Sequence, residues 1–244
     1  MTTTLIVGAS GATGKHLVEQ LLNMGQKVKI IVRTAENLPA PWKNNNQVTI
    51  ITANVSEISE DDMAKHLSGC HAVASCLGHN ISFKGIFGKP RRLVTDAVRT
   101  ICNTIKKHES INKPIKFVLM NTSGNRNRDL EEPISMGERF VITLLRLLLP
   151  PHVDNEKAAD QLRTKIGQDD KTIEWVAVRP DNLVNGDKVT EYETFPSPIR
   201  SAIFNAGTTS RINVGHFMAD LIVNDNLWNK WRGQMPVVYN KSTQ

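Results

Sequence analysis

The stretch Thr4-Leu5-Ile6-Val7-Gly8-Ala9-Ser10-Gly11-Ala12-Thr13-Gly14 joins an apolar run to three glycines near the start of the chain. The apolar run predicts a buried strand, and the amphipathic segment at 13–24 predicts a helix directly after it. Glycines on such a turn let a pyrophosphate approach the backbone and accept hydrogen bonds from the helix N-terminus. Glycines at this spacing can also mark a tight turn packed on a sheet. The strand before the turn and the helix after it favour a dinucleotide site.

Strand-like runs alternate with helical periodicity along the whole chain. This alternation predicts an α/β fold with a doubly wound parallel sheet. The strands are nearly all apolar, which is typical of a sheet covered by helices on both faces. The expected strands are 4–8, 28–33, 48–52, 72–77, 115–121, 173–179 and 236–239, and the expected helices are 13–24, 60–68, 90–108, 134–149, 154–166 and 214–224.

Composition points to a small-molecule enzyme more than to a nucleic-acid binder. The chain has 244 residues, enough for one large core, and its 30 Lys and Arg against 24 Asp and Glu give a net charge of +6. The basic residues are scattered, with no run typical of nucleic-acid binding, so no nucleic-acid partner is expected. The three cysteines, Cys70, Cys76 and Cys102, lack metal-ligand spacing and indicate buried thiols in a reducing compartment. With no leader-like N-terminus, the expected location is the cytoplasm, and no metal site is expected.

The most apolar segment, 140–149, is interrupted by Arg146 and is followed by Pro150-Pro151. It is shorter than the roughly 20 residues that a membrane span needs. We expect a buried or pocket-covering helix here and no transmembrane segment. Peripheral membrane attachment and a protein partner remain open alternatives, and the oligomeric state is not indicated.

Arg33 ends the second expected strand, about 20 residues after the glycines, where dinucleotide folds distinguish the two nicotinamide cofactors. An acidic side chain there would bind the ribose 2′-hydroxyl, whereas Arg33 can form a bidentate contact with a 2′-phosphate. The position therefore favours NADP over NAD, and Thr34 could add a hydroxyl. An ordinary surface arginine is the alternative.

Polar residues also follow the other strands, at the edge where ligands bind in open parallel sheets. Asn54 and Val55 could bracket the adenine, although Asn54 is equally plausible as a turn residue. Gly78 would let the chain pass close to a ribose. The contacts expected from the first five strand ends are Gly8, Ser10, Gly11, Ala12, Thr13, Gly14, Arg33, Thr34, Asn54, Val55, Leu77, Gly78 and Thr122.

These motifs resemble the atypical short-chain dehydrogenase/reductases, in the NmrA-like, NAD(P)H-binding branch that includes biliverdin IX-beta reductase and flavin reductase. The resemblance implies one NAD(P)-binding Rossmann domain over 1–244, with a core at about 1–180 and a substrate-side extension at 181–244. It also implies NADP preference through Arg33 and nicotinamide packing near Arg179, Pro180 and Leu183. The matching pieces are 7–14, 32–33, 68–73, 76–78, 122–123, 154–162, 176–180 and 210–214.

The chain departs from the superfamily's usual catalytic pair, a Tyr tuned by a Lys four residues later. Tyr192 and Tyr239 are followed at that distance by Pro196 and Thr243. Related sequences carry the lysine, or a histidine, on the helix that corresponds to 154–166, where the best match here is Glu156. Lys157 is one position along and would point about 100° away around a helix.

Three interpretations remain for the catalytic residues. Ser123 could bind the substrate or the nicotinamide amide while Asp154 or Glu156 handles a proton. Hydride transfer to a flavin or another conjugated molecule could instead need only proximity, with the proton from water. Alternatively, the chain binds NADP without turnover, as a redox sensor, regulator or assembly factor. The structural alternatives are a strand-end cap for Ser123, a helix N-cap for Asp154 and a first-turn carboxylate for Glu156.

The segment 79–92 follows the fourth strand and is a candidate substrate loop. His79 suits general acid catalysis, and Lys84, Arg91 and Arg92 could receive an anionic substrate. An exposed first helical turn is the preferred interpretation for the two arginines. The sequence therefore predicts an NADPH-dependent reductase of a small conjugated or carbonyl-containing molecule, flavin- or quinone-like, with the non-catalytic NADP-binding protein as the alternative.

Overall fold

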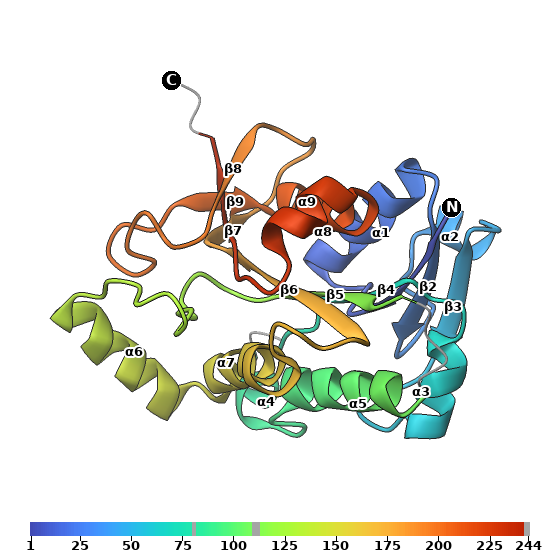
Figure 1. Cartoon of the computed structure of the whole chain (residues 1–244), viewed down its shortest axis with the longest axis horizontal. Helices are drawn as coiled ribbons and strands as arrows, with labels where there is room; N and C mark the ends of the chain where they lie inside the picture. The colour runs from blue at the N-terminus through green and yellow to red at the C-terminus, as the bar shows by residue number, and fades with distance from the viewer. Residues whose placement is uncertain (80–81, 109–112, 242–244) are drawn as a thin grey trace.

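A computed structural model of the protein describes residues 1–79, 82–108 and 113–241. An eight-stranded sheet lies at its centre in the order β3-β2-β1-β4-β5-β6-β10-β8, with helices on both faces (Figure 1). This confirms the predicted doubly wound α/β fold. The strands of this sheet are β1 Thr3–Val7, β2 Lys27–Val32, β3 Val48–Thr52, β4 Ala72–Ser75, β5 Ile115–Met120, β6 Ile173–Pro180, β8 Tyr192–Phe195 and β10 Val237–Asn240.

The strand order reverses at β1, which pairs in parallel with β2 on one side and with β4 on the other. The chain runs outward from β1 through β2 to β3, then returns to β4 and continues through β5 to β6 in the other direction. A crevice forms at such a switch point because the loops on its two sides leave in opposite directions. The glycine turn after β1 lies at this point.

Helices cover the two faces of the sheet (Figure 1). The helices α1, α8 and α9 lie on one face, and α3, α5 and α7 lie on the other. The described helices are α1 Ala12–Asn23, α2 Ala40–Lys43, α3 Glu60–Leu67, α4 Phe83–Phe87, α5 Leu93–Lys107, α6 Met136–Leu148, α7 Pro150–Asp160, the π-helix η1 Gln161–Ile166, α8 Arg211–Val223 and α9 Asp225–Trp231.

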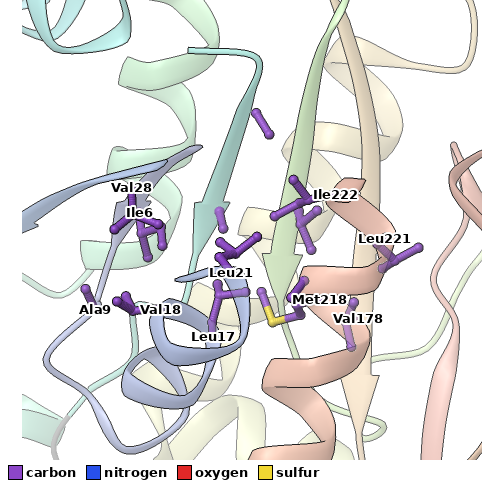
Figure 2. Packing of buried hydrophobic residues seen from close by; sticks show 14 of the residues in the cluster. Ile6, Ala9, Leu17, Val18, Leu21, Val28, Val178, Met218, Leu221 and Ile222 are labelled. Carbon is purple, nitrogen blue, oxygen red and sulfur yellow. The ribbon is translucent and has the colours of Figure 1, made fainter. Parts of the chain in front are cut away.

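Two apolar clusters form the core, one on each face. The first joins Leu17, Leu21 and their neighbours on α1 to Met218 and Leu221 on α8, over strand residues such as Val178 (Figure 2). The second joins α3, α5 and α7 to the opposite faces of the same strands. Because both faces are buried, the strands lack polar alternation, as their sequences predicted.

The last third of the chain adds strands that the sequence predicted only in part. The expected strand at 236–239 is β10, which pairs in parallel with β6. The sequence analysis did not predict β8, which pairs antiparallel with β10, or the small sheet of β7, Asn182–Val184, and β9, Thr208–Ser210. These strands are three or four residues long, which is too short for an alternating pattern to be recognised in the sequence.

Two of the predicted helices differ from the structure, one in its start and one in its burial. The helix expected at 154–166 begins at Pro150, because a proline in the first turn needs no intrahelical N–H bond, and its last six residues are the π-helix η1. The helix expected at 134–149 is α6, but only Ile142 of α6 is buried. The expectation of a buried helix was therefore wrong, whereas Glu138 and Ile142 of α6 line a cavity, as the pocket-covering alternative predicted.

Gly215 sets the distance between α8 and α1. A Cβ at this position would lie 2.8 Å from the Leu17 backbone nitrogen and 2.9 Å from the His16 carbonyl carbon. We expect Gly215→Ala to lower the free energy of unfolding by about 2 kcal/mol, because the helices must separate and loosen the first cluster. Urea denaturation measures the change. Gly78→Ala is the matched control, since a Cβ there meets no atom within 4 Å; equal losses in both variants would contradict the proposed fit.

Candidate cofactor and substrate site

Gly8 and Gly14 are fixed by contacts within the protein. Gly8 follows β1 with a φ of +79°, and a Cβ there would lie 2.5 Å from the Cys76 carbonyl carbon. A Cβ on Gly14 would lie 2.1 Å from the Gly8 carbonyl oxygen. Since the obstructing atoms belong to the backbone, neither position accepts a side chain. The two glycines thus hold α1 directly over the ends of β1 and β4.

Gly11 leaves the N-terminus of α1 open. It is the N-cap residue, with no side-chain cap, and the first turn of α1 carries no acidic residue. Ser10, Gly11 and Ala12 are exposed, whereas Thr13 and Gly14 are buried beneath them. The first N–H groups of a helix have no intrahelical partner and lie at the positive end of its dipole. This turn can therefore cradle a phosphate, and the closely packed glycines fit a dinucleotide.

Arg33 lies at the same edge of the sheet as the glycine turn. Ile31 of β2 pairs with Val7 of β1, so the chain leaves both strands side by side. Arg33 and Thr34 are exposed, and no described carboxylate forms an ion pair with Arg33. Thr34 Oγ1 accepts a hydrogen bond of 3.3 Å from the Glu36 N–H. The guanidinium is thus available to an anion beside the turn.

The Asn54 side chain forms hydrogen bonds within the turn that follows β3. Its amide donates to Glu57 over 2.7 Å, and its oxygen accepts from the Ser56 hydroxyl over 2.8 Å. Val55 is half-buried and packs against the second apolar cluster. The Asn54 side chain therefore has local partners, as the turn interpretation predicted.

The ends of β4 and β5 border the crevice opposite Arg33. Leu77 is half-buried against the second cluster, while Gly78 is exposed, with open space around it. Thr122 follows β5, is half-buried, and its Oγ1 accepts from the Gly124 N–H over 3.3 Å. These positions lie at the carboxyl ends of neighbouring strands.

Ser123 is held by a carboxylate that the sequence analysis did not identify. Its hydroxyl donates to Asp181 Oδ1 over 2.9 Å, and the other oxygen of Asp181 accepts from the Gly207 N–H over 2.8 Å. Ser123 and Asp181 are both buried. With its hydrogen directed at Asp181, Ser123 retains oxygen lone pairs that can accept a hydrogen bond from a ligand. Asp181 follows β6 directly, and only the fold shows that the ends of β5 and β6 are adjacent.

Asp154 caps a different helix from its own. The predicted N-cap was wrong, since α7 begins at Pro150. Its carboxylate instead accepts from the backbone N–H groups of Val94 over 2.8 Å and Thr95 over 3.0 Å, in the first turn of α5. The Thr95 hydroxyl donates to the Asp154 carbonyl over 2.9 Å. Asp154 thereby fastens α7 to α5.

His79 completes this cap. Its Nε2 lies 2.8 Å from Asp154 Oδ2, and its Nδ1 lies 3.2 Å from the Gly85 carbonyl oxygen. Both ring nitrogens thus face protein acceptors, and the side chain is buried. Arg91 and Arg92 are exposed just before α5, as the preferred interpretation predicted. The side chain of Lys84 lies outside the described part of the structure.

Glu156 forms an ion pair rather than occupying a first turn, because it is the seventh residue of α7. Arg146 Nε and Nη2 donate to its carboxylate over 2.9 Å and 2.8 Å. His152 Nε2 lies 3.5 Å from the same group. Burial alone would raise the pKa of Glu156, but the neighbouring His152 and the hydrogen bonds from Arg146 outweigh it and lower that pKa to about 2. The Glu156 carboxylate is therefore ionised and already bound to the Arg146 side chain.

Arg179 is fully buried, and its guanidinium faces the protein interior. It pairs with Glu132, with Nη2 2.7 Å from Oε1 and Nη1 3.1 Å from Oε2. Its remaining hydrogens reach the carbonyls of Met235, Asn125 and Pro196. Pro180 is also buried, and Leu183 is half-buried against the first cluster. The Arg179 side chain thus supports this corner of the crevice without facing a ligand.

Neither tyrosine has the environment of a catalytic phenol. The Tyr192 hydroxyl lies 2.8 Å from His216 Nδ1, and burial raises the pKa of Tyr192. Burial also raises the pKa of Tyr239. A neighbouring ammonium would act in the opposite direction. The pKa of each tyrosine is therefore displaced upward, away from the range of a phenol activated by a neighbouring lysine.

A cavity of about 460 Å³ adjoins Ser123. Its walls include Arg126 after β5, Glu138 and Ile142 on α6, and the segment 198–203. The volume falls in the range of small-molecule pockets. A larger cavity of about 920 Å³ lies at the amino ends of β4 and β5, remote from the glycine turn. The smaller cavity lies beyond the carboxyl end of β5, at the same edge of the sheet as the glycine turn.

The sequence profile of the NAD(P)H-binding family matches residues 8–225. The chain belongs to this family. Its fold is shared by a short-chain dehydrogenase/reductase of Veillonella parvula in complex with NADP, with a TM-score of 0.70 and 15% identity over 99% of this chain and 96% of that one. A protein of Streptococcus pneumoniae, provisionally described as an NADH-flavin reductase, gives a TM-score of 0.65 and 18% identity over 99% and 100%.

One further solved structure and one protein sequence are similar to this chain. The oxidoreductase ylbE of Lactococcus lactis gives a TM-score of 0.69 and 18% identity over 99% of this chain and 92% of that one. An uncharacterized chloroplastic protein of Arabidopsis thaliana, At2g34460, is 42% identical over 52 residues, which cover 21% of this chain and 19% of that protein. At these identities the solved structures support the fold and leave the substrate open.

Within the described ranges, no group of three or more His, Cys, Asp or Glu side chains is arranged to hold a metal ion. No described helix is long and apolar enough to cross a bilayer.

The ion pair of Glu156 has a measurable pH signature. Its folded pKa of about 2 lies below the ordinary value of 4.5, so its stabilisation is complete above pH 4.5 and is lost as pH falls toward 2. Between pH 4.5 and pH 2 the free energy of unfolding should fall in both proteins. We expect the fall to be larger in the native protein than in Glu156→Gln, by on the order of 2 kcal/mol. Chemical denaturation across the pH series measures it. Glu131→Gln, at an exposed position, should retain the native slope; parallel slopes for native protein and Glu156→Gln would contradict the role.

Proposed function

We propose that the chain is an NADPH-dependent reductase that transfers a hydride to a small conjugated or carbonyl-containing acceptor, such as a flavin or quinone. The observation that carries this proposal is the open glycine turn with the unpaired Arg33 beside it. The pocket next to Ser123 supports a substrate at the far end of the crevice. The family assignment supports NAD(P)H as the cofactor class.

Selectivity for NADP rests on Arg33. The turn after β1 takes the pyrophosphate, and the chain leaves β2 alongside it, so the adenosine ribose would lie near Arg33 and Thr34. A guanidinium can form two charge-assisted hydrogen bonds with a 2′-phosphate, whereas the 2′-hydroxyl of NAD gives it no anionic partner.

The remaining strand ends complete the cofactor site in this proposal. Val55 supplies an apolar contact for the adenine and the Asn54 backbone a polar one, because its side chain is occupied. Leu77, Gly78 and Thr122 pass along the middle of the dinucleotide. Pro180 and Leu183 flank the nicotinamide, and the buried Arg179 holds their segment in place.

The chemistry needs few protein groups. Bound NADPH would supply the hydride, and the chain's own residues would fix its distance from the acceptor. Ser123 would accept a hydrogen bond from the carboxamide NH₂, because Asp181 already takes the hydroxyl hydrogen. The polar atoms of Asp154, Glu156 and His79 are engaged within the protein, so we assign these residues the role of holding α5, α6 and α7 together. Water would then supply the proton that the reduced acceptor takes up.

The occupied state of His79, Asp154 and Glu156 also favours a second candidate, a non-catalytic NADP-binding regulator. Both candidates require cofactor binding, and only the first requires turnover. NADPH oxidation with a panel of flavins, quinones and carbonyl compounds separates them. Tight NADPH binding without oxidation by any acceptor would favour the regulator.

Cofactor preference tests the first part of the proposal. We expect Arg33→Ala to weaken NADPH binding by about tenfold or more while NADH binding changes little, because only NADPH carries the 2′-phosphate. Arg33→Asp should move the preference toward NADH. Titration calorimetry with both cofactors measures the ratio. Arg99→Ala removes an exposed arginine on α5 and should leave the ratio unchanged; unchanged selectivity in Arg33→Ala would overturn the assignment.

Turnover tests the second part. We expect Ser123→Ala to lower kcat by about tenfold with any accepted substrate, because the nicotinamide loses one orienting hydrogen bond. The affinity for NADPH should fall less, since the phosphates carry most of the binding. Ser123→Thr keeps the hydroxyl and should restore much of the rate. Equal kcat in the native protein and in Ser123→Ala, measured as NADPH oxidation, would exclude this role for the serine.

A further inference from the structure

The outer face of α6 is apolar and exposed. Met136 is 90% exposed, Phe140 67% and Leu147 75%, and Leu144 and Leu148 are also exposed. In contrast, Ile142 is the one buried residue among the described residues of this helix. Large apolar side chains that remain in water on one helix indicate a contact surface.

The apolar side chains form one continuous stripe. At about 100° per residue, Met136, Phe140, Leu144, Leu147 and Leu148 fall within an arc of about 120°. A surface helix of a globular protein normally turns such an arc toward its own core. Here the same arc faces away, and α6 lies at one end of the molecule beyond the sheet and its covering helices (Figure 1).

Two apolar residues from another segment extend this surface. Ile199 is 57% exposed and Phe204 64%. A Cβ on Gly137 would lie 3.3 Å from Phe204 Cε2, so the Phe204 ring rests against the first turn of α6. Ile199 also lines the cavity next to Ser123. We call the five exposed residues of α6 together with Ile199 and Phe204 the apolar end.

The charges around the apolar end are predominantly positive. Arg139 and Arg146 border one side of the stripe, and Arg200 lies beside Ile199 in the chain. Glu138, the one acidic residue of α6, is engaged in the capping box with Ser135. Arg146 is paired with Glu156, but no described carboxylate forms an ion pair with Arg139 or Arg200. The Arg200 guanidinium lies over the Tyr239 ring, 5.9 Å from its centroid. The surface thus combines an apolar arc with basic residues at its border, of which Arg139 has no described carboxylate or ring as a partner.

This charge pattern decides between two occupants. In a two-fold pairing of copies through α6, the unpaired Arg139 of each copy would be brought to one interface beside the positive Arg146. An anionic lipid surface would neutralise them while the apolar arc enters the boundary between headgroups and acyl chains. Helices with an apolar arc and basic borders bind membranes in this way, lying in the plane of the interface.

We propose that the apolar end binds the surface of a bilayer that contains anionic lipids. The proposal concerns peripheral binding, with α6 lying parallel to the surface. It does not depend on the proposed reductase activity. The cavity next to Ser123 shares Ile199 with this surface, so a bound protein would hold the cavity near the lipid.

The test is co-sedimentation of the full chain with phosphatidylcholine vesicles, with and without about one-third phosphatidylglycerol. We expect binding to the anionic vesicles that weakens as salt is raised, and at least about tenfold weaker binding of Phe140→Glu/Leu147→Glu. Arg139→Glu should remove most of the preference for phosphatidylglycerol. Val223→Glu places a charge at an exposed apolar position on α8 and should bind like the native protein.

Two controls keep the outcomes distinct. NADPH binding by each variant, measured by calorimetry, reports whether the fold is intact and is independent of vesicle binding. Sedimentation velocity reports self-association without lipid. The proposal is overturned if the native protein does not bind anionic vesicles, if the double variant binds as well as the native protein, or if the native protein is a dimer that the double variant dissociates.

Discussion

A guanidinium that is wholly removed from water organises the substrate side of the molecule. Arg179 leaves β6 beneath the crevice and uses its donors on Glu132 and on three backbone carbonyls from separate segments. Charges buried in this way are tolerated only when their partners are complete, and loss of one partner is costly. The loop after β5, the approach to β10 and the segment after β8 are therefore held to one another through a single side chain. The wall of the substrate cavity takes its shape from this connection.

The two halves of the crevice differ in how their polar groups are used. On the cofactor side, the described residues provide no partner for the first backbone N–H groups of α1 or for the Arg33 side chain, which leaves them available to an anion. On the substrate side, Ser123, Asp154, Glu156 and His79 are bonded to other parts of the chain. Binding capacity is thus concentrated where the backbone is exposed, and the side chains with reactive chemistry mainly stabilise the packing of helices. This division agrees with a site that positions a reactive cofactor and contributes little proton chemistry itself.

Local sequence was sufficient for the parallel sheet and for the glycine turn, because both depend on short patterns: buried apolar runs, and glycines that precede a helix. It also placed Arg33, since the distance from the turn to the end of the next strand varies little in this fold. It could not show that Asp181 binds Ser123, that Glu132 neutralises Arg179, or that Asp154 caps α5. Each of these pairs joins residues that lie far apart in the chain, and no spacing rule links them. The outward orientation of α6 was missed for a related reason: an apolar stripe has the same periodicity whether the helix faces the core or the solvent.

The packing of α8 on α1 has a consequence for the order in which the protein matures during synthesis. The helix that presents the glycine turn rests, through Leu17 and Leu21, on residues of α8 that emerge from the ribosome about 200 residues later (Figure 2). Until then α1 has only β1 and β2 to pack on, through residues such as Ile6 and Val28, and the part of its apolar side that meets α8 has no cover. A nascent chain can therefore build the first half of the sheet early, but it acquires a firmly supported nucleotide cradle only when translation is nearly finished. Prematurely ended chains would expose this side of α1, a recognisable signal for chaperones and proteases.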